Sequence, residues 1–449
     1  MRALTGLIVL PLVVACGAET PSQDSTTDPK AESTPNLADS DGDVDDGPGA
    51  GPGAGPEKYE LEGDDAKGRW RPARIENPAL AERIAELEAI GYADGYHEAE
   101  ERSDVTVHDP ERAWQGLNLV VSGHGPEAIL MDMQGNALHT WRRGYHEAVP
   151  GHKKKYPRDF YRRAWLYPNG DLLAIFKGHV LAKLDVESNV LWTFKGNPHH
   201  DLEVLDDGRI AILTRKAHVL PRIHPTDPVL EDFVSILGPR GKELQRVSVL
   251  ECFENSELKD FLDGMEVDGD LLHTNTIEVL DGRHASKHPA FAAGNVLVSC
   301  LKTDTIAVLD LDEEKAVWAR RDGWKAQHQP TFLPDGSMLV FDNQGDPSGN
   351  GTTRVIELDP ATGEVAWTYA GLENDPLETR SCGSNQRLPN GNTLITESDN
   401  GRALEVTPEG ETVWEYVNPH RAGENGRLVA TLFEVVRLPE DYCKTWLVR

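Results

Sequence analysis

Residues 327–369 read QHQPTFLPDGSMLVFDNQGDPSGNGTTRVIELDPATGEVAWTY and contain one complete unit of a pattern that other parts of the chain repeat. The unit predicts four strands, at His328–Phe332, Ser337–Phe341, Arg354–Leu358 and Glu364–Tyr369. Turns rich in Pro, Asp and Gly separate the β-rich runs, and such turns are the signal of β-hairpins. A unit of this size cannot bury both of its faces alone, so we expect it to be one of a ring or stack.

The last hairpin of this unit occurs six times along the chain. The copies are MDMQGNALHTW (131–141), LDVESNVLWTF (184–194), LGPRGKELQRV (237–247), LDLDEEKAVWAR (309–320), LDPATGEVAWTY (358–369) and VTPEGETVWEY (406–416). Their turns lie roughly 50 residues apart, with one gap nearer 70, which is the range for four-stranded blades. Four copies place a tryptophan at the same position, and we interpret these residues as core between neighbouring sheets: Trp192, Trp318, Trp367 and Trp414. The repeats predict an all-β fold, a six-bladed β-propeller over residues 111–449.

One further β-rich run follows the sixth hairpin. Residues 426–438, GRLVATLFEVVRL, have no partner within their own blade. We expect this run to pair with the blade that begins near Leu117, so that the two ends of the propeller close the ring.

The N-terminus carries an export signal. Residues 1–16, MRALTGLIVLPLVVAC, place an apolar run too short to span a bilayer before small residues and a cysteine, which is typical of a signal peptide. Val13 to Cys16 resembles the lipobox of bacterial lipoproteins, and this resemblance implies removal of residues 1–15 and acylation of Cys16. The alternative is an ordinary signal peptide cleaved elsewhere. Gly17 favours the outer membrane, so we expect a protein of the bacterial cell envelope that contacts the membrane through its lipid anchor only.

Residues 16–66 are acidic, rich in Pro and Gly and poor in large apolar side chains, so we expect a disordered tether. A run of aspartates at 39–45 mimics a calcium loop, but Val44 stands where such a loop needs glycine. Residues 67–110 are interpreted as a helical lead-in, because apolar residues within 78–100 recur on one helical face. The net charge of -30 argues against a nucleic acid as partner.

Four cysteines follow Cys16 in the chain, at Cys252, Cys300, Cys382 and Cys443. An exported protein permits one or two disulfides among them, and the sequence leaves all three full pairings open. None of the four has the spacing of metal ligands, so we expect neither a metal site nor a cofactor.

Histidines begin three of the expected first strands of the blades. His200, His273 and His328 each stand eight or nine residues before the glycine of the first turn. A histidine at a strand start is commonly a packing residue, but its recurrence at one structural position predicts three imidazoles aimed at a common axis. Arg354 and Arg380 add positive charge near the same end. Imidazoles and a guanidinium suit an oxyanionic group, as nucleophile, acid or base, and as a clamp on its oxygens.

Six stretches make the chain similar, over about residues 116–442, to the bacterial nucleotide-independent arylsulfotransferases. They are LNLVVSGHGPEAILMDMQGNALHTW (117–141), HHDLEVL (199–205), HTNTIEVL (273–280), QHQPTFLPDGSMLVFDN (327–343), QRLPNGNTLITE (386–397) and VWEYVNP (413–419). The resemblance implies a six-bladed propeller that moves a sulfuryl group from an aryl sulfate to a phenol. It also implies a ping-pong mechanism through a sulfohistidine.

This chain departs from the family pattern at one place. The nucleophilic histidine of the family belongs at the start of the last blade, where this chain reads ETRSCGSN (378–385). The catalytic candidates are therefore His328 as nucleophile, His273 and Arg354. The candidate substrate-binding residues are His200, Asn275, Asn343 and Arg380. The alternative function is a propeller that binds an anionic or aromatic ligand or a protein partner without chemistry, and the oligomeric state is left open.

Overall fold

A computed structural model describes residues 96–98 and 101–447, apart from 152–158, 177–178, 268, 346–351, 423–425 and 427. The signal peptide, Cys16 and the tether with its run of aspartates lie outside the described residues. The helix predicted within 78–100 also lies mostly outside them, and its described residues Tyr96–Glu98 form a strand instead.

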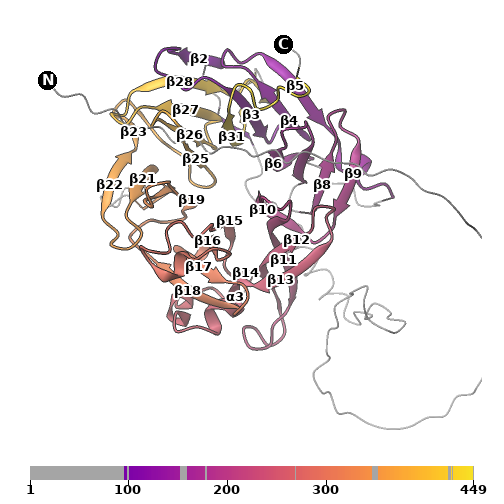
Figure 1. The fold of residues 1–449 in the computed structure, drawn as a ribbon, viewed down its shortest axis with the longest axis vertical. Helices are drawn as coiled ribbons and strands as arrows, with labels where there is room; N and C mark the ends of the chain where they lie inside the picture. The colour runs from indigo at the N-terminus through magenta and orange to yellow at the C-terminus, as the bar shows by residue number, and fades with distance from the viewer. Residues whose placement is uncertain are drawn as a thin grey trace, which may run out of the picture. The chain divides into compact units, whose positions relative to one another are not determined.

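Six antiparallel sheets surround a common axis, so the predicted six-bladed β-propeller is confirmed (Figure 1). In blades 2 to 5 the chain runs from the axis outward. Blade 2 contains β6 (Tyr161–Leu166), β7 (Leu172–Phe176), β8 (Val180–Leu184) and β9 (Val190–Phe194). Blade 3 contains β10 (Pro198–Val204), β11 (Ile210–Val219), β12 (Pro228–Leu237) and β13 (Glu243–Ser248), with β14 (Gly269–Asp270) beside β12.

Blade 4 contains β15 (Thr274–Val279), β16 (Val296–Cys300), β17 (Thr305–Asp310) and β18 (Lys315–Arg320). Blade 5 contains β19 (His328–Phe332), β20 (Met338–Asp342), β21 (Arg354–Leu358) and β22 (Val365–Tyr369). The strands predicted within residues 327–369 therefore agree with blade 5 to within one residue.

Both ends of the propeller take part in closing the ring. Blade 1 contains β31 (Leu432–Leu438), β3 (Leu117–Ser122), β4 (Glu127–Met131) and β5 (Ala137–Arg142). Its innermost strand β31 pairs antiparallel with β3, with Leu438 opposite Leu117, which confirms the predicted closure (Figure 1).

The second closing strand comes from the N-terminal side. Blade 6 contains β25 (Ser384–Arg387), β26 (Thr393–Glu397), β27 (Arg402–Val406) and β28 (Thr412–Val417). A fifth strand, β2 (Asp104–His108), pairs antiparallel with β28. This strand falls inside the segment 67–110 that was predicted to be helical. The helical pattern lies within 78–100 and does not include this strand. The alternation of Val105 and Val107 is too short to predict a strand by itself, so the pairing with β28 decides the conformation.

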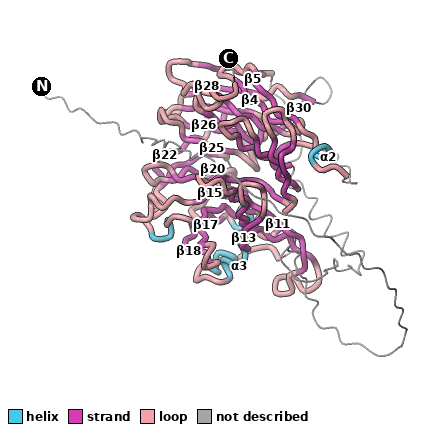
Figure 2. Tube along the Cα trace, turned by 45° about the vertical axis from the view of Figure 1, so that its right-hand side comes forward, coloured by secondary structure: helices cyan, strands magenta, loops and turns pink. Residues whose placement is uncertain are grey.

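Short elements lie outside the blades. They are β1 (Tyr96–Glu98), β29 (Arg421–Ala422) and β30 (Leu428–Ala430) in one sheet, and β23 (Gly371–Leu372) with β24 (Asp375–Pro376). The described helices are α2 (Tyr145–Ala148), α3 (Val249–Glu254) and the 3-10 turns Lys259–Leu262, Pro289–Phe291 and Leu301–Thr303. Figure 2 shows α2 and α3 at the margins of the propeller. Among the described residues no helix is long and apolar enough to cross a membrane.

The core lies between neighbouring blades, where apolar side chains from facing sheets pack together. Trp414 is fully buried and its Nε1 donates to Met133 O at 2.9 Å, which ties blade 6 to blade 1. Trp318 is also buried, whereas Trp192 and Trp367 are partly exposed, so the predicted core role holds fully for two of the four tryptophans. Cys252, Cys300, Cys382 and Cys443 are buried and no disulfide joins them.

Candidate functional site

A backbone irregularity marks the start of the inner strands in four blades. The strand pairing shifts register at the beginning of β10, β15 and β19. Positive φ angles occur there at His200 (49°), His273 (52°) and Gln329 (46°), and at Cys382 (63°) just before β25. Bulges of this kind bend a strand and re-aim its side chains. The bulges of β10, β15 and β19, and the positive φ angle at Cys382 before β25, therefore turn side chains of blades 3 to 6 toward one end of the axis.

The structure brings together the three histidines singled out in the sequence. The rings of His200 and His273 have centroids 4.9 Å apart. Burial lowers the pKa of His200 well below its usual value, and the nearby charges of Arg162, His273, His199 and His328 lower it further. Imidazoles from blades 3, 4 and 5 thus form one cluster, which we call the histidine cluster.

His328 is held in one tautomer by its neighbours. Its Nδ1 lies 3.0 Å from Ala326 O and 2.9 Å from Asn343 Oδ1. Both partners are acceptors, so Nδ1 carries the hydrogen and Nε2 carries the lone pair. Burial lowers the pKa of His328 to about 3, and the charges of Arg162 and His273 act in the same direction. At neutral pH His328 is therefore an uncharged imidazole, the form that acts as a nucleophile.

Asn343 links His328 to the segment that precedes β25. Its Nδ2 donates to Thr379 O at 2.9 Å and to Cys382 O at 2.6 Å, while its Oδ1 accepts from His328. The side chain is fully buried. Both amide hydrogens are engaged by the segment that precedes β25, so Asn343 fixes the position of His328 relative to blade 6.

Of the other two histidines, His273 contacts a carboxylate directly, whereas His200 contacts a second histidine that lies beside a carboxylate. Nδ1 of His273 lies 2.7 Å from Asp270 Oδ2. Nδ1 of His200 lies 2.8 Å from Nδ1 of His199, whose Nε2 lies 3.3 Å from Asp232 Oδ1. A carboxylate in this place fixes the orientation of the imidazole beside it.

Arg162 is the cation of the histidine cluster, and sequence reasoning missed it. It lies in β6 of blade 2, its Nη2 is 3.6 Å from Cys382 Sγ, and its guanidinium stacks over the Phe433 ring at 4.8 Å. Burial raises the pKa of the Cys382 thiol, and Arg162 opposes this shift. Cys382 thus occupies the stretch 378–385 where the resembling family has its histidine. The only sequence signal for Arg162 was the pair Arg162-Arg163 at the start of a first strand.

The remaining predicted site residues have other partners. Arg354 Nε donates to Asp342 Oδ2 at 2.8 Å and its Nη2 donates to Gly345 O. Asn275 Nδ2 donates to Gln327 O at 2.8 Å, which links blade 4 to the start of β19. Arg380 is exposed and its backbone N–H donates to Asp399. Among the described residues Arg354 and Arg380 therefore support loops near the histidine cluster, while Arg162 supplies its positive charge.

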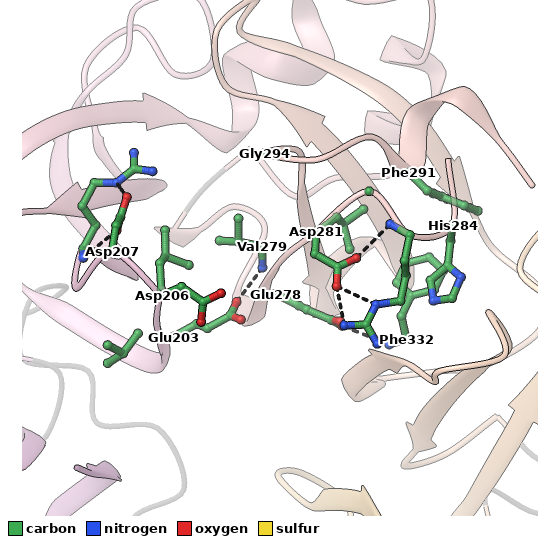
Figure 3. Close-up of a pocket in the computed structure, with 16 residues that line it drawn as sticks. Glu203, Asp206, Asp207, Glu278, Val279, Asp281, His284, Phe291, Gly294 and Phe332 are labelled. Atoms are coloured by element: carbon green, nitrogen blue, oxygen red, sulfur yellow. Dashed lines mark hydrogen bonds and ion pairs between the residues drawn. The ribbon is translucent and has the colours of Figure 1, made fainter. Parts of the chain in front are cut away.

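The opposite ends of β10 and β15 line a pocket of about 530 Å³ (Figure 3). Glu203 Oε2 accepts from Val279 N at 2.6 Å, and Glu278 Oε2 accepts from Phe332 N at 3.0 Å. Each glutamate thus caps a backbone N–H on the inner strand of the next blade. Burial raises the pKa of Glu203 to about 7 and that of Glu278 to about 8.

The raised pKa values of these two carboxyls predict that the free energy of unfolding falls as the pH rises. A carboxyl with a higher pKa in the folded chain than in the unfolded chain stabilises folding less as pH rises through that range. Between pH 5 and pH 8.5 we expect the wild type to lose about 1 to 3 kcal/mol of unfolding free energy more than Glu278→Gln. Urea unfolding at each pH measures the difference, and Glu364→Gln, on an exposed turn, serves as the control. Parallel pH profiles for wild type and Glu278→Gln would contradict the assignment.

Comparisons with known proteins were made for the whole chain. The family model described as "Arylsulfotransferase (ASST)" matches residues 163–419, which is more than half of the chain. A solved protein of unknown function from Bacteroides caccae is 12% identical, with a TM-score of 0.47, covering 72% of this chain and 98% of that chain. The WD40 β-propeller domain of Doa1 is 14% identical, with a TM-score of 0.40, covering 77% and 96%. None of the curated proteins matches.

Proposed function

The chain belongs to the arylsulfotransferase family, and from this premise we propose that it transfers a sulfuryl group from an aryl sulfate ester to a phenol through the histidine cluster. The family membership itself supports an aryl sulfotransferase-like activity. The proposed route uses His328 as nucleophile and needs no cofactor.

In the first half-reaction Nε2 of His328 attacks the sulfur of the ester. The N–S bond forms while the bond between sulfur and the aryl oxygen breaks, and the leaving phenolate takes a proton from His273. The Asp270 carboxylate, 2.7 Å from Nδ1 of His273, supports the protonated ring that this step requires. The product is a sulfohistidine whose Nδ1 hydrogen still faces Asn343.

In the second half-reaction the acceptor phenol gives its proton to His273 and attacks the sulfur. The N–S bond breaks and His328 returns to its uncharged form. Arg162 stabilises the negative charge that develops on the sulfuryl oxygens, because a guanidinium offers paired hydrogen-bond donors to such oxygens. His200 and Asn275 flank the same position and are proposed to contact the substrate.

The single observation that carries this proposal is the state of His328. Two acceptors hold its Nδ1 hydrogen, burial keeps the ring uncharged, and Arg162 lies close enough to lower its pKa. A histidine that only packs in the core does not require this combination of three features.

The direct test is turnover of a chromogenic aryl sulfate with and without an added phenol. We expect release of the chromogenic phenol to depend on the acceptor, and the sulfuryl group to appear on that acceptor. Release without acceptor dependence would indicate hydrolysis.

A second candidate function is binding without chemistry, and the residue Cys382 at the start of blade 6 favours it. In that case the protein would bind an aryl sulfate, another anionic or aromatic ligand, or a protein partner. Measurable affinity for aryl sulfates with no turnover and no covalent label would support this candidate over transfer.

Location is also part of the proposal: we expect the protein to be held at the bacterial cell envelope by acylated Cys16. The Cys16→Ser variant should lose acylation and move from the detergent phase to the aqueous phase on phase partitioning. Cys443→Ser is the matched control, because that thiol lies in the propeller. Wild-type levels of Cys16→Ser in the detergent phase would contradict the anchor.

A further inference from the structure

Three side chains that commonly bind metals meet beside the closure of the ring. They are His124, Glu127 and His420, whose ligand atoms all lie within 4.8 Å of one another. His124 lies in the turn before β4, Glu127 is the first residue of β4, and His420 lies between β28 and β29. The three residues, which we call the closure cluster, play no part in the proposed sulfuryl transfer.

The contacts within the closure cluster are close. His124 Nε2 lies 2.6 Å from Glu127 Oε1. The rings of His124 and His420 stack in parallel, with centroids 3.3 Å apart and planes 5° from each other. The side chains of Glu127 and His124 are 4% and 13% exposed. Two imidazoles and one carboxylate therefore face one another with little solvent between them.

A second set of contacts orients these groups from behind. His124 Nδ1 is hydrogen-bonded to Ser122 Oγ, and the other carboxylate oxygen of Glu127 accepts from the Arg142 guanidinium. His420 is held by its backbone, since its N–H donates to Asn418 Oδ1 and its carbonyl accepts from Ala430 N. Metal-binding histidines and carboxylates are commonly oriented by such outer contacts.

We propose that His124, Glu127 and His420 bind one divalent transition-metal ion of the zinc class. Two imidazole nitrogens and one carboxylate oxygen form a ligand set that suits Zn²⁺ and leaves a fourth position for water. Ligand atoms about 2.0 to 2.1 Å from a tetrahedral ion lie about 3.3 Å apart. An imidazole binds a metal in the plane of its ring, so binding requires the His420 ring to turn out of its parallel stack with His124.

Binding of the metal ion at this site releases one proton. The ion replaces the hydrogen that His124 Nε2 shares with Glu127 Oε1, and that proton is released to solvent. His124 Nδ1 stays hydrogen-bonded to Ser122 Oγ. His420 offers one ring nitrogen within 4.8 Å of the ligand atoms of His124 and Glu127.

Such an ion would join parts of the chain that are nearly 300 residues apart in sequence. His124 and Glu127 belong to blade 1, whereas His420 follows the last strand of blade 6. Because these ligands meet only in the folded chain, the ion binds the closed ring and not the unfolded chain, and it should therefore stabilise the closed ring.

The test uses the untagged full chain, stripped of metal and titrated with Zn²⁺ in a calorimeter. We expect one site per chain, a higher unfolding temperature with Zn²⁺, and affinity at least about 10- to 100-fold weaker in His420→Ala and in His124→Ala. The control is His224→Ala, which removes another histidine near a carboxylate, at 3.9 Å from Asp227, and should bind like wild type. All variants keep the acidic N-terminal segment, so any metal ion bound there contributes equally to the titrations of wild type and variants.

A second readout does not depend on any variant folding. Co²⁺ added to the wild type should give the intense visible absorption of a tetrahedral site with nitrogen and oxygen ligands, and Zn²⁺ should abolish it. No binding of either ion by the wild type, or equal affinity in wild type and His420→Ala, would overturn the proposal.

Discussion

Replacing His328 by alanine should lower aryl sulfate turnover by about 10⁴- to 10⁶-fold and abolish the covalent intermediate. The reason is that its Nε2 is the only protein atom that bonds to sulfur in the proposed route, and water in the vacated space cannot form a sulfohistidine. The measurement is label transfer: incubation with an aryl sulfate labelled in its sulfuryl group, an alkaline quench, and peptide mapping by mass spectrometry.

Two controls separate this chemistry from a loss of folding. His284→Ala removes a histidine of the pocket at the other end of β15, and it should label and turn over like wild type (Figure 3). Arg162→Ala should keep the label site while losing about 10²- to 10³-fold in rate, as expected for a contact to developing charge. Label on His273, His200 or Cys382 in the wild type would reject His328 as nucleophile.

Truncation after Pro419 should abolish cooperative unfolding. It removes β31, whose Leu432, Phe433 and Val435 are buried in the core. It also removes Arg437, which is fully buried and whose Nη1 lies 2.8 Å from Glu405 Oε2, so a buried carboxylate would lose its partner. The loss of one partner of a buried pair alone costs about 3 to 5 kcal/mol, and the unpaired edge of β3 and the lost burial add to it.

Thermal unfolding followed by circular dichroism measures this effect. An equally long deletion at residues 17–46, in the segment predicted to be a tether, should leave the transition unchanged. A soluble product of the Pro419 truncation with the wild-type melting transition would show that β31 is dispensable, in conflict with its place in blade 1.

The blades could be predicted from the sequence because their signals are local. In residues 327–369 each strand alternates and each turn carries glycine, so β19 and β21 are predicted with their observed bounds. The closing strand could also be predicted, since residues 426–438 have no partner within the sixth repeat, and β31 pairs with β3 of blade 1 as expected. The strand β2 could not, because five residues with two valines become a strand only when β28 is present beside them.

The site residues are harder to predict from the sequence, because the geometry of the site comes from contacts between blades. The histidines recur at one position of the repeat, which is why His200, His273 and His328 were found together. Arg162 comes from a blade without a histidine at that position, and nothing repeated points to it. Arg354 was chosen for its place beside a glycine-rich loop, but Asp342 on the paired strand β20 binds its guanidinium.

The pairing of β31 with β3 also affects how the protein is made. Leu117 leaves the ribosome more than 300 residues before Leu438, its partner across the two strands. Blade 1 therefore waits with an unpaired inner edge through nearly the whole of synthesis. Contacts of such high order are slow to form, and an open strand edge can pair with a neighbouring nascent chain. The ring closes last, and the interval before closure is when this protein is most exposed to misassembly.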